Sequence, residues 1–128
     1  MTFFFFIGGY ASTHFEVKLT DKQLCYYLHD WPMRVGEPYI APTHTEDVRE
    51  NPAWSVLLEW LGNADWLPEY NSPIMDGIQW KINFKDGKAA IKSNGSNAYP
   101  DDFQTFLKLL SNVSSHPVVN KHLSIHLD

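Results

Sequence analysis

The chain has 128 residues, 44% of them hydrophobic and 15% aromatic, with one cysteine and a formal net charge of −5. The length fits a single domain over residues 1–128, the apolar content is too high for a disordered chain, and one cysteine cannot form an internal disulfide. No apolar run approaches the roughly 20 residues that span a bilayer, and the acidic balance argues against binding to phosphates, so we expect neither a membrane nor a nucleic-acid partner.

The first apolar run covers residues 3–7 and ends at Gly8-Gly9. A secretory signal would carry basic residues before an apolar stretch of about 7–15 residues, and no Lys or Arg precedes this run. Aromatic residues favour strands, and apolar residues at both alternating sets of positions predict a central strand covered on both faces. We therefore expect a cytoplasmic protein in which Cys25 stays reduced.

Two further strands are predicted at residues 14–19 and 24–28, where side chains alternate in character on either side of a polar turn. Short connections between three neighbouring strands are typical of an antiparallel meander. From residue 30 to 44, three prolines and a glycine interrupt any regular pattern. This segment is predicted to be a long loop.

Capping signals predict a helix in the middle of the chain. Thr43 and Glu46 have the spacing of a capping box, which predicts a short helical turn. Pro52 suits the first turn after an Asn51 cap, so the main helix is expected to run to Leu61. Its apolar stripe would consist of Trp54, Leu57, Leu58 and Leu61.

The clearest strand signal covers residues 78–84, where apolar and polar residues alternate, after a short aromatic segment at residues 66–70. Asp86-Gly87 predicts a hairpin with a type I′ turn, followed by a return strand from residue 88 to about 93. The Asn-Gly-Ser-Asn cluster at residues 94–97 is typical of a turn.

A second helix is predicted to open at Pro100, with Asp101 and Asp102 in its first turn, where acids favour the helix dipole. The tail, residues 118–127, is a candidate last strand, with a short helix as the alternative. A sheet with one apolar face needs a cover. The sequence therefore predicts an α+β fold, an antiparallel β-sheet of about five or six strands with two amphipathic helices packed on one face.

Two motifs, D-G-I-Q-W at residues 76–80 and G-S-N-A-Y-P at residues 95–100, resemble a pattern in small uncharacterised bacterial proteins. In those proteins D-G-x-x-W lies on a strand and G-S-N-x-Y-P leads into a helix. The resemblance covers roughly residues 54–110. It implies a bacterial or mobile-element origin, but no activity and no site residues. The residues themselves favour a structural role, with Gly95 in a sharp turn and Ser96 or Asn97 as a cap for backbone groups.

Patterns for catalysis and metal binding are weak. His122 and His126 have the i, i+4 spacing of two ligands on a helix, but in the strand predicted there they would lie about 13 Å apart. Cys25 is expected to be a small buried residue rather than a nucleophile. The sequence contains no serine-nucleophile elbow, phosphate loop or dinucleotide motif. We therefore expect no catalytic residue, no metal site and no cofactor.

The charge is unevenly distributed along the chain. Residues 30–76 hold nine acids against two arginines, a net of −7, together with four of the five tryptophans, whereas residues 77–128 carry a net of +2. An acidic region with aromatic residues can steer and anchor a basic protein partner. The lysines of the second half are expected to protect a sheet edge, because nucleic-acid binding would need arginines and interleaved aromatics. They are Lys81, Lys85, Lys88 and Lys92.

The sequence thus favours a non-enzymatic bacterial protein-interaction module, immunity- or inhibitor-like, that covers a basic surface on a partner protein. The residues predicted to bind that partner are Glu46, Asp47, Glu50, Glu59 and Trp60. The alternative is a small-molecule-binding protein or enzyme with a site between the 30–44 loop and the sheet, using His29, His44 or Asp76. A homodimer is the third hypothesis, because Val56 and Trp60 give the first helix a second apolar side.

Overall fold

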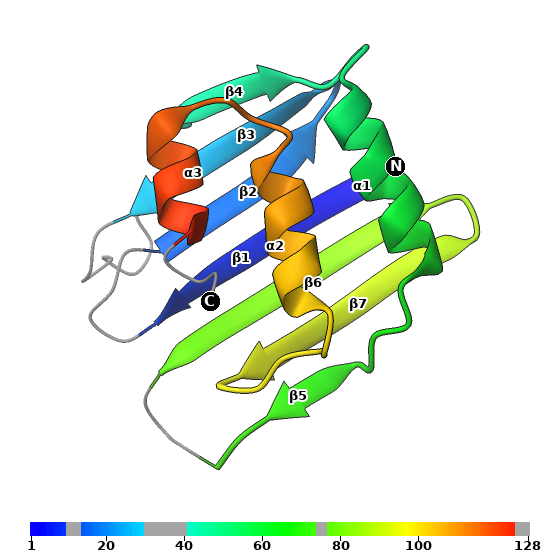
Figure 1. The fold of residues 1–128 in the computed structure, drawn as a ribbon, viewed down its shortest axis with the longest axis vertical. Coiled ribbons are helices and arrows are strands. Elements are labelled where there is room, and N and C mark those ends of the chain that lie inside the picture. The colour runs from blue at the N-terminus through cyan, green and yellow to red at the C-terminus, as the bar shows by residue number, and fades with distance from the viewer. Residues whose placement is uncertain (10–13, 30–40, 74–76, 125–128) are drawn as a thin grey trace.

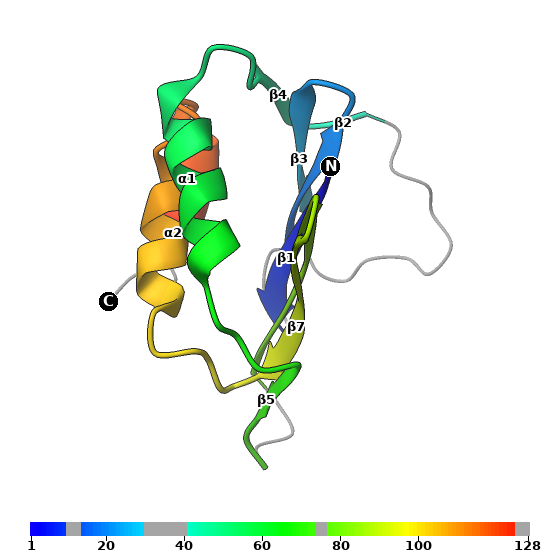
Figure 2. The same ribbon diagram turned by 90° about the vertical axis from the view of Figure 1, so that its right-hand side faces the viewer.

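The computed structural model describes residues 1–9, 14–29, 41–73 and 77–124, which form one mixed sheet with helices on one face (Figure 1, Figure 2). The strands are β1 (Thr2–Gly9), β2 (His14–Thr20), β3 (Gln23–His29), β4 (His44–Asp47), β5 (Glu69–Asn71), β6 (Ile78–Asp86) and β7 (Ala89–Ser96). The helices are α1 (Pro52–Asn63), α2 (Phe103–Ser111) and α3 (Pro117–Ser124). The predicted α+β class is confirmed, with seven strands and three helices in the described residues.

The sheet has the strand order β4-β3-β2-β1-β6-β7-β5, which places the first strand of the chain at its centre. β1, β2 and β3 form the predicted antiparallel meander, and β6 pairs with the other edge of β1. β5 runs parallel to β7, so the sheet is mixed rather than wholly antiparallel as predicted. β1 is central, as expected, but the described helices cover one of its faces and not both (Figure 2).

The main core lies between the helices and the covered face of the sheet. Phe5 of β1 is fully buried, and its ring lies 4.9 Å from that of Phe106 in α2, measured between centroids. Phe3 meets Trp54 of α1 edge-on at 5.4 Å. The predicted stripe of α1 is buried except for Leu58, which is half-buried. The apolar stripe of α2 is buried as a whole and consists of Phe103, Phe106, Leu107 and Leu110.

Residues 44–47 form an edge strand, so the capping box predicted for Thr43 and Glu46 is wrong. The amide of Thr43 donates to the carbonyl of Tyr26, and its side-chain hydroxyl accepts a bond from the amide of Leu28. Thr43 thereby extends the pairing of β4 with β3 instead of capping a helix. The side chain of Glu46 turns to His44 instead of to a backbone amide.

The predicted tail strand is also wrong, and the alternative, a short helix, is confirmed. α3 begins at Pro117 and buries Val119 and Leu123, which are four residues apart on one helix face. The second helix, α2, begins at Phe103 rather than Pro100. Residues 100–102 instead form a turn in which the carbonyl of Pro100 accepts a bond from the amide of Phe103.

The β6–β7 hairpin is confirmed, but its turn lies one residue further along the chain than predicted. Asp86 pairs with Ala89, so the two central residues of the turn are Gly87 and Lys88. Gly87 has a φ of +61°, and Lys88 is not among the residues with positive φ. Positive φ at the first central position alone is the geometry of a type II′ turn, which corrects the predicted type I′.

The two motifs of the second half pack against each other across β6 and β7. The Trp80 indole lies against Gly95 on the neighbouring strand, and its Nε1–H donates a 2.9 Å bond to the carbonyl of Ala98. The side-chain oxygen of Asn97 accepts a 2.8 Å bond from the amide of Ile78. Gly95 therefore allows the close approach of an indole within a strand, rather than the sharp turn predicted for residues 94–97.

Asn51 is expected to stabilise the fold twice, as the cap of α1 and as a link to the α2–α3 connection. Its Oδ1 accepts bonds from the amides of Ala53 and Trp54, and its Nδ2 donates a 3.0 Å bond to the carbonyl of Val113. We expect Asn51→Ala to lower the free energy of unfolding by about 2 kcal/mol, roughly 1 for the cap and 1 for the link.

Asn51→Ser serves as the matched variant, because serine caps helices well but is too short to reach Val113. Its expected loss is about 1 kcal/mol. Urea denaturation measures both variants. Equal losses in the two would show that the cap contributes nothing.

Candidate functional site

A groove of about 600 Å³ opens where α1 ends and α2 begins. This volume lies within the range of about 300–1,000 Å³ that is typical of ligand pockets. Three aromatic and three acidic side chains line it. They are Trp60, Trp66 and Tyr70, and Asp65, Asp101 and Asp102.

The aromatic wall of this groove is fixed by the core behind it. Trp66 meets Trp80 and Phe106 edge-on, at centroid distances of 5.6 and 5.5 Å. Its Nε1–H donates a 2.8 Å bond to Oδ1 of Asp102. Trp60 is half-buried, meets Trp66 edge-on at 6.1 Å and stacks on Phe106. Trp60 does not belong to the apolar stripe that the sequence predicts for the first helix. In the structure it lines the groove.

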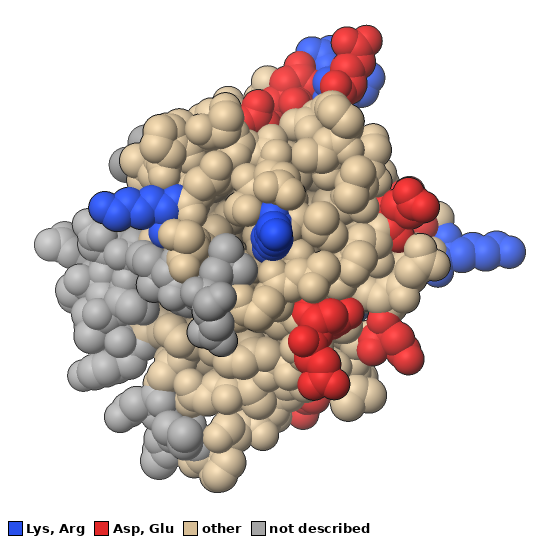
Figure 3. Space-filling model, in the orientation of Figure 1, with Lys and Arg blue, Asp and Glu red and all other residues tan. Residues whose placement is uncertain are grey.

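The groove is negatively charged. Asp65 and Asp101 are exposed, while Asp102 is half-buried and already engaged by Trp66. The lining residues fall within two stretches of the sequence, 50–80 and 93–107, that contain no lysine and no arginine. Carboxylates accordingly gather below the ends of these helices in the space-filling view (Figure 3).

The five predicted partner-binding residues do not form one patch. Asp47 lies on β4, Glu50 lies in the turn before α1, and Glu59 and Trp60 lie near the other end of that helix. Glu50 and Trp60 are therefore separated by about 15 Å along the helix direction. Of the five, Trp60 lines the groove.

The charges at the β4 end are partly neutralised. Arg49 Nη2 lies 2.6 Å from Oδ2 of Asp47, and its hydrogen bonds lower the pKa of the Asp47 carboxyl to about 2. Glu46 Oε1 lies 3.2 Å from Nε2 of His44. Asp47 and Glu46 are thus engaged within the chain, whereas the groove carboxylates Asp65 and Asp101 face solvent.

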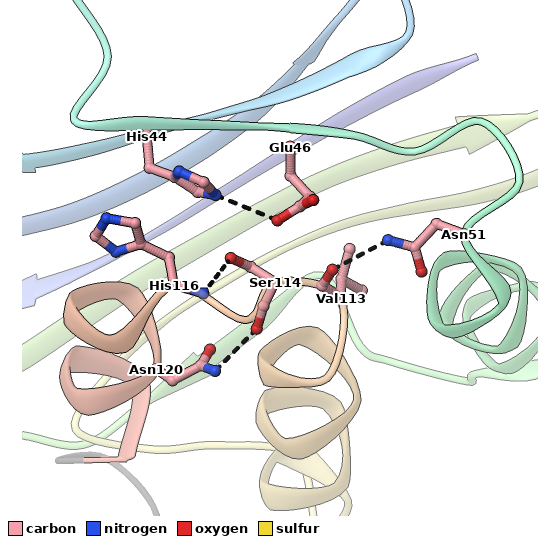
Figure 4. Close-up of polar contacts among 7 residues, drawn as sticks. All are labelled: His44, Glu46, Asn51, Val113, Ser114, His116 and Asn120. Carbon is pink, nitrogen blue, oxygen red and sulfur yellow. Dashed lines mark hydrogen bonds and ion pairs between the residues drawn. The ribbon is translucent and has the colours of Figure 1, made fainter.

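A second polar cluster joins β4 to the start of α3 (Figure 4). The rings of His44 and His116 lie 4.4 Å apart between centroids, and His44 also bonds Glu46. The Ser114 hydroxyl accepts a bond from the amide of His116, and the Ser114 carbonyl accepts one from Nδ2 of Asn120. The Ser114 bonds join α3 to the turn that precedes it, and the His44–His116 contact places this turn beside the edge strand β4.

Tyr26 of β3 lies beside His44 of β4, and the centroids of the two rings are 5.6 Å apart. Burial raises the pKa of the Tyr26 hydroxyl above its ordinary value, and the negative charge of Glu46 raises it further. The hydroxyl is therefore neutral at physiological pH and cannot act as a base. Of the residues proposed for an enzyme site, His44 lies in this cluster, while Asp76 and the side chain of His29 lie outside the described residues.

The second apolar side predicted for α1 lies partly at the surface. Val56 is 52% exposed and borders a shallow hollow of about 250 Å³ with Pro52 and Leu109. Trp60, the other residue off the stripe, packs against Trp66 instead. The homodimer stays a prediction, which the mass of the protein in solution tests directly.

No family model, curated protein or solved structure matches this chain. Within the described ranges, no three histidine, cysteine, aspartate or glutamate side chains come together as a metal site. None of the helices described has the length and apolar character needed to cross a membrane.

Sequence reasoning missed most of this groove. It placed Asp65 and Trp66 in the acidic, tryptophan-rich region but gave Asp101 and Asp102 only a role in helix initiation. A signal was present, because the two segments that meet here share the absence of lysine and arginine. What the sequence did not show is that they are neighbours in space.

Proposed function

We propose that this protein is a non-enzymatic interaction module, of the immunity or inhibitor type, which binds a basic segment of a partner protein in the groove. The observation that carries the proposal is the pairing of two tryptophans with exposed carboxylates around about 600 Å³. Trp60 and Trp66 provide rigid anchors of the kind that dominate binding energy in interfaces. The carboxylates provide a negative potential that speeds association with a basic surface.

Arginine is the side chain that this site fits best. A guanidinium group can stack on the face of an indole and pair with carboxylates at the same time. Trp60 is a half-buried part of the aromatic wall, and Asp65 and Asp101 are exposed acids that line the same groove. Because the bond to Asp102 and the core behind it hold Trp66 in place, little side-chain ordering is needed on binding.

Titration with a short peptide of alternating glycine and arginine tests this proposal, with tryptophan fluorescence as the signal. We expect Asp65→Lys combined with Asp101→Lys to weaken binding by about tenfold or more, equivalent to about 1.4 kcal/mol. The matched control is Asp47→Lys combined with Glu50→Lys, which changes the net charge equally at the other end of α1. We expect the control to change affinity by less than about twofold, through long-range charge alone.

The two double variants separate the groove from the wider acidic surface predicted by sequence. If only the Asp47 and Glu50 variant weakens binding, the partner site lies at the β4 end and the groove is not used. If both variants bind the peptide as tightly as the original chain, the acidic interaction surface itself is refuted.

A further inference from the structure

The face of the sheet opposite the helices carries its own aromatic side chains. Phe4 and Phe6 alternate with the buried Phe3 and Phe5 along β1, and both are part-exposed. The helices all lie on the other side of the sheet (Figure 2). Side chains two residues apart on a strand lie about 6.7 Å from each other. The centre of the sheet thus presents two neighbouring phenyl rings away from the helices.

Lysines lie beside these rings on the neighbouring strands. Phe4 is opposite Lys18 of β2, and Phe6 is opposite Lys81 of β6. Phe4 also pairs with Asn83 of β6, and Asn83 pairs in turn with Lys92 of β7, so Lys92 lies on the same face two strands from Phe4. Opposed side chains in a sheet share a face, with Cβ atoms about 4.5–5.5 Å apart. The phenyl rings and the ammonium groups therefore belong to one surface.

Around Phe4 and Phe6, the described residues of this surface carry more basic than acidic side chains, although the whole chain is acidic. Lys81, Lys85 and Lys92 are exposed on it, whereas Glu16, the acid opposite Phe6, is only 8% exposed. The ammonium group of Lys18 lies 5.4 Å from the centroid of the Tyr27 ring, above an aromatic face of the same surface. The net charge of −5 is therefore unevenly distributed. Exposed lysines lie on the sheet face, and carboxylates line the groove on the helix side.

We propose that this sheet face binds single-stranded nucleic acid. Phe4 and Phe6 would stack with unpaired bases, and Lys81 and Lys92 would neutralise the phosphates that flank them. A duplex cannot use these rings, because its base faces are already stacked inside the helix. An acidic peptide could meet the lysines but has no bases for the phenyl rings. The site lies on the opposite side of the molecule from the groove and does not depend on it.

This proposal departs from the sequence-based expectation of no nucleic-acid partner. That expectation was based on the acidic balance of the chain and on the lack of arginines and aromatics among the lysines of the hairpin, where Gln79 and Asn83 are the other residues on the polar face of β6. The register of the sheet supplies the missing aromatics from β1, more than seventy residues earlier in the chain. Local sequence cannot show such an arrangement.

The test is fluorescence polarisation of a labelled oligothymidylate of about 15 nucleotides, which spans the usual site sizes for such surfaces. We expect binding at low ionic strength that weakens as salt rises. Lys81→Gln combined with Lys92→Gln should make the slope of log K against log salt shallower by about 1.4, or 0.7 for each phosphate contact. Phe4→Leu combined with Phe6→Leu should weaken binding at least about fivefold for each ring that loses a stacked base, with the slope unchanged.

Lys108→Gln combined with Lys121→Gln is the matched control, because it removes two exposed lysines from the helix side. Its affinity and slope should stay close to those of the original chain. An equal loss in this control, equal affinity for a duplex of the same length, or equal affinity for polyglutamate would overturn the proposal. If the phenylalanine variant fails to fold, as circular dichroism would show, the two lysine variants still decide the question.

Discussion

Replacing Phe5 with alanine is expected to lower the free energy of unfolding by about 3–5 kcal/mol. The ring is fully buried and contacts Phe15, Phe103 and Phe106, with centroids 4.9 to 6.4 Å away. Because this packing joins the central strand to a neighbouring strand and to α2, the cavity left by alanine cannot close by a local shift. The loss is a large part of the roughly 5–15 kcal/mol that stabilises a domain.

Phe4→Ala is the matched control for this prediction, since it removes the same side chain from the next position of the same strand. Phe4 is part-exposed on the opposite face, and its expected loss is about 1 kcal/mol. Equilibrium urea denaturation of both variants measures the difference. Similar losses at the two positions would show that the second face of the sheet is as well covered as the first.

Gly95→Ala is expected to destabilise the protein by about 2–3 kcal/mol through overpacking. A Cβ atom at this position would collide with Nε1 of Trp80 and lie 2.6 Å from the carbonyl oxygen of Ala98. The indole cannot move aside freely, because its Nε1–H donates to that same carbonyl. The backbone of β7 must therefore shift, which disturbs its pairing with β6.

Gly62→Ala provides the opposite control. Gly62 lies within α1, and a Cβ atom there would meet nothing within 4 Å. Alanine favours the helix over glycine, so this variant should be more stable by up to about 1 kcal/mol. Thermal and urea denaturation of the two alanine variants should move in opposite directions. A neutral Gly95→Ala would mean that the close approach of Trp80 is not needed for the fold.

The elements with a long and consistent hydrophobic period were predictable from sequence. The stripe of α2 appears at the spacing of a helix face, and the alternation along β6 continues for seven residues before the hairpin. Asn51 and Pro52 also identified the start of α1 correctly. In these segments local preference and tertiary packing favour the same structure.

The short elements were not predictable, because their sequences fit two structures. Thr43 and Glu46 have the spacing of a helix cap, but pairing with β3 outweighs that local preference. In the tail, Leu123 belongs to an alternating set and also lies four residues after Val119. Burial of Val119 and Leu123 selects the helix.

Neither of the two proposed binding surfaces could be derived from local sequence. The groove joins residues 60–70 to residues 100–102, and the sheet face joins β1 to β6. Each surface depends on strand order, which hydrophobic periodicity does not encode. Charge partition along the chain included Asp65 of the groove but not Asp101 or Asp102, and it missed the lysines of the sheet face because they and their aromatic neighbours are far apart in sequence.

The central position of β1 has a consequence for synthesis of the protein. Phe5 pairs with Ile82, which lies 77 positions further along the chain. At a synthesis rate of about 5–20 residues per second, one edge of β1 therefore stays unpaired for roughly 4–15 s. β2 and β3 follow at once and protect the other edge. A run of phenylalanines with an open strand edge is prone to aggregate. Chaperone demand on the ribosome should therefore peak between the completion of β3 and the arrival of β6, and messages truncated in that interval should yield insoluble chains.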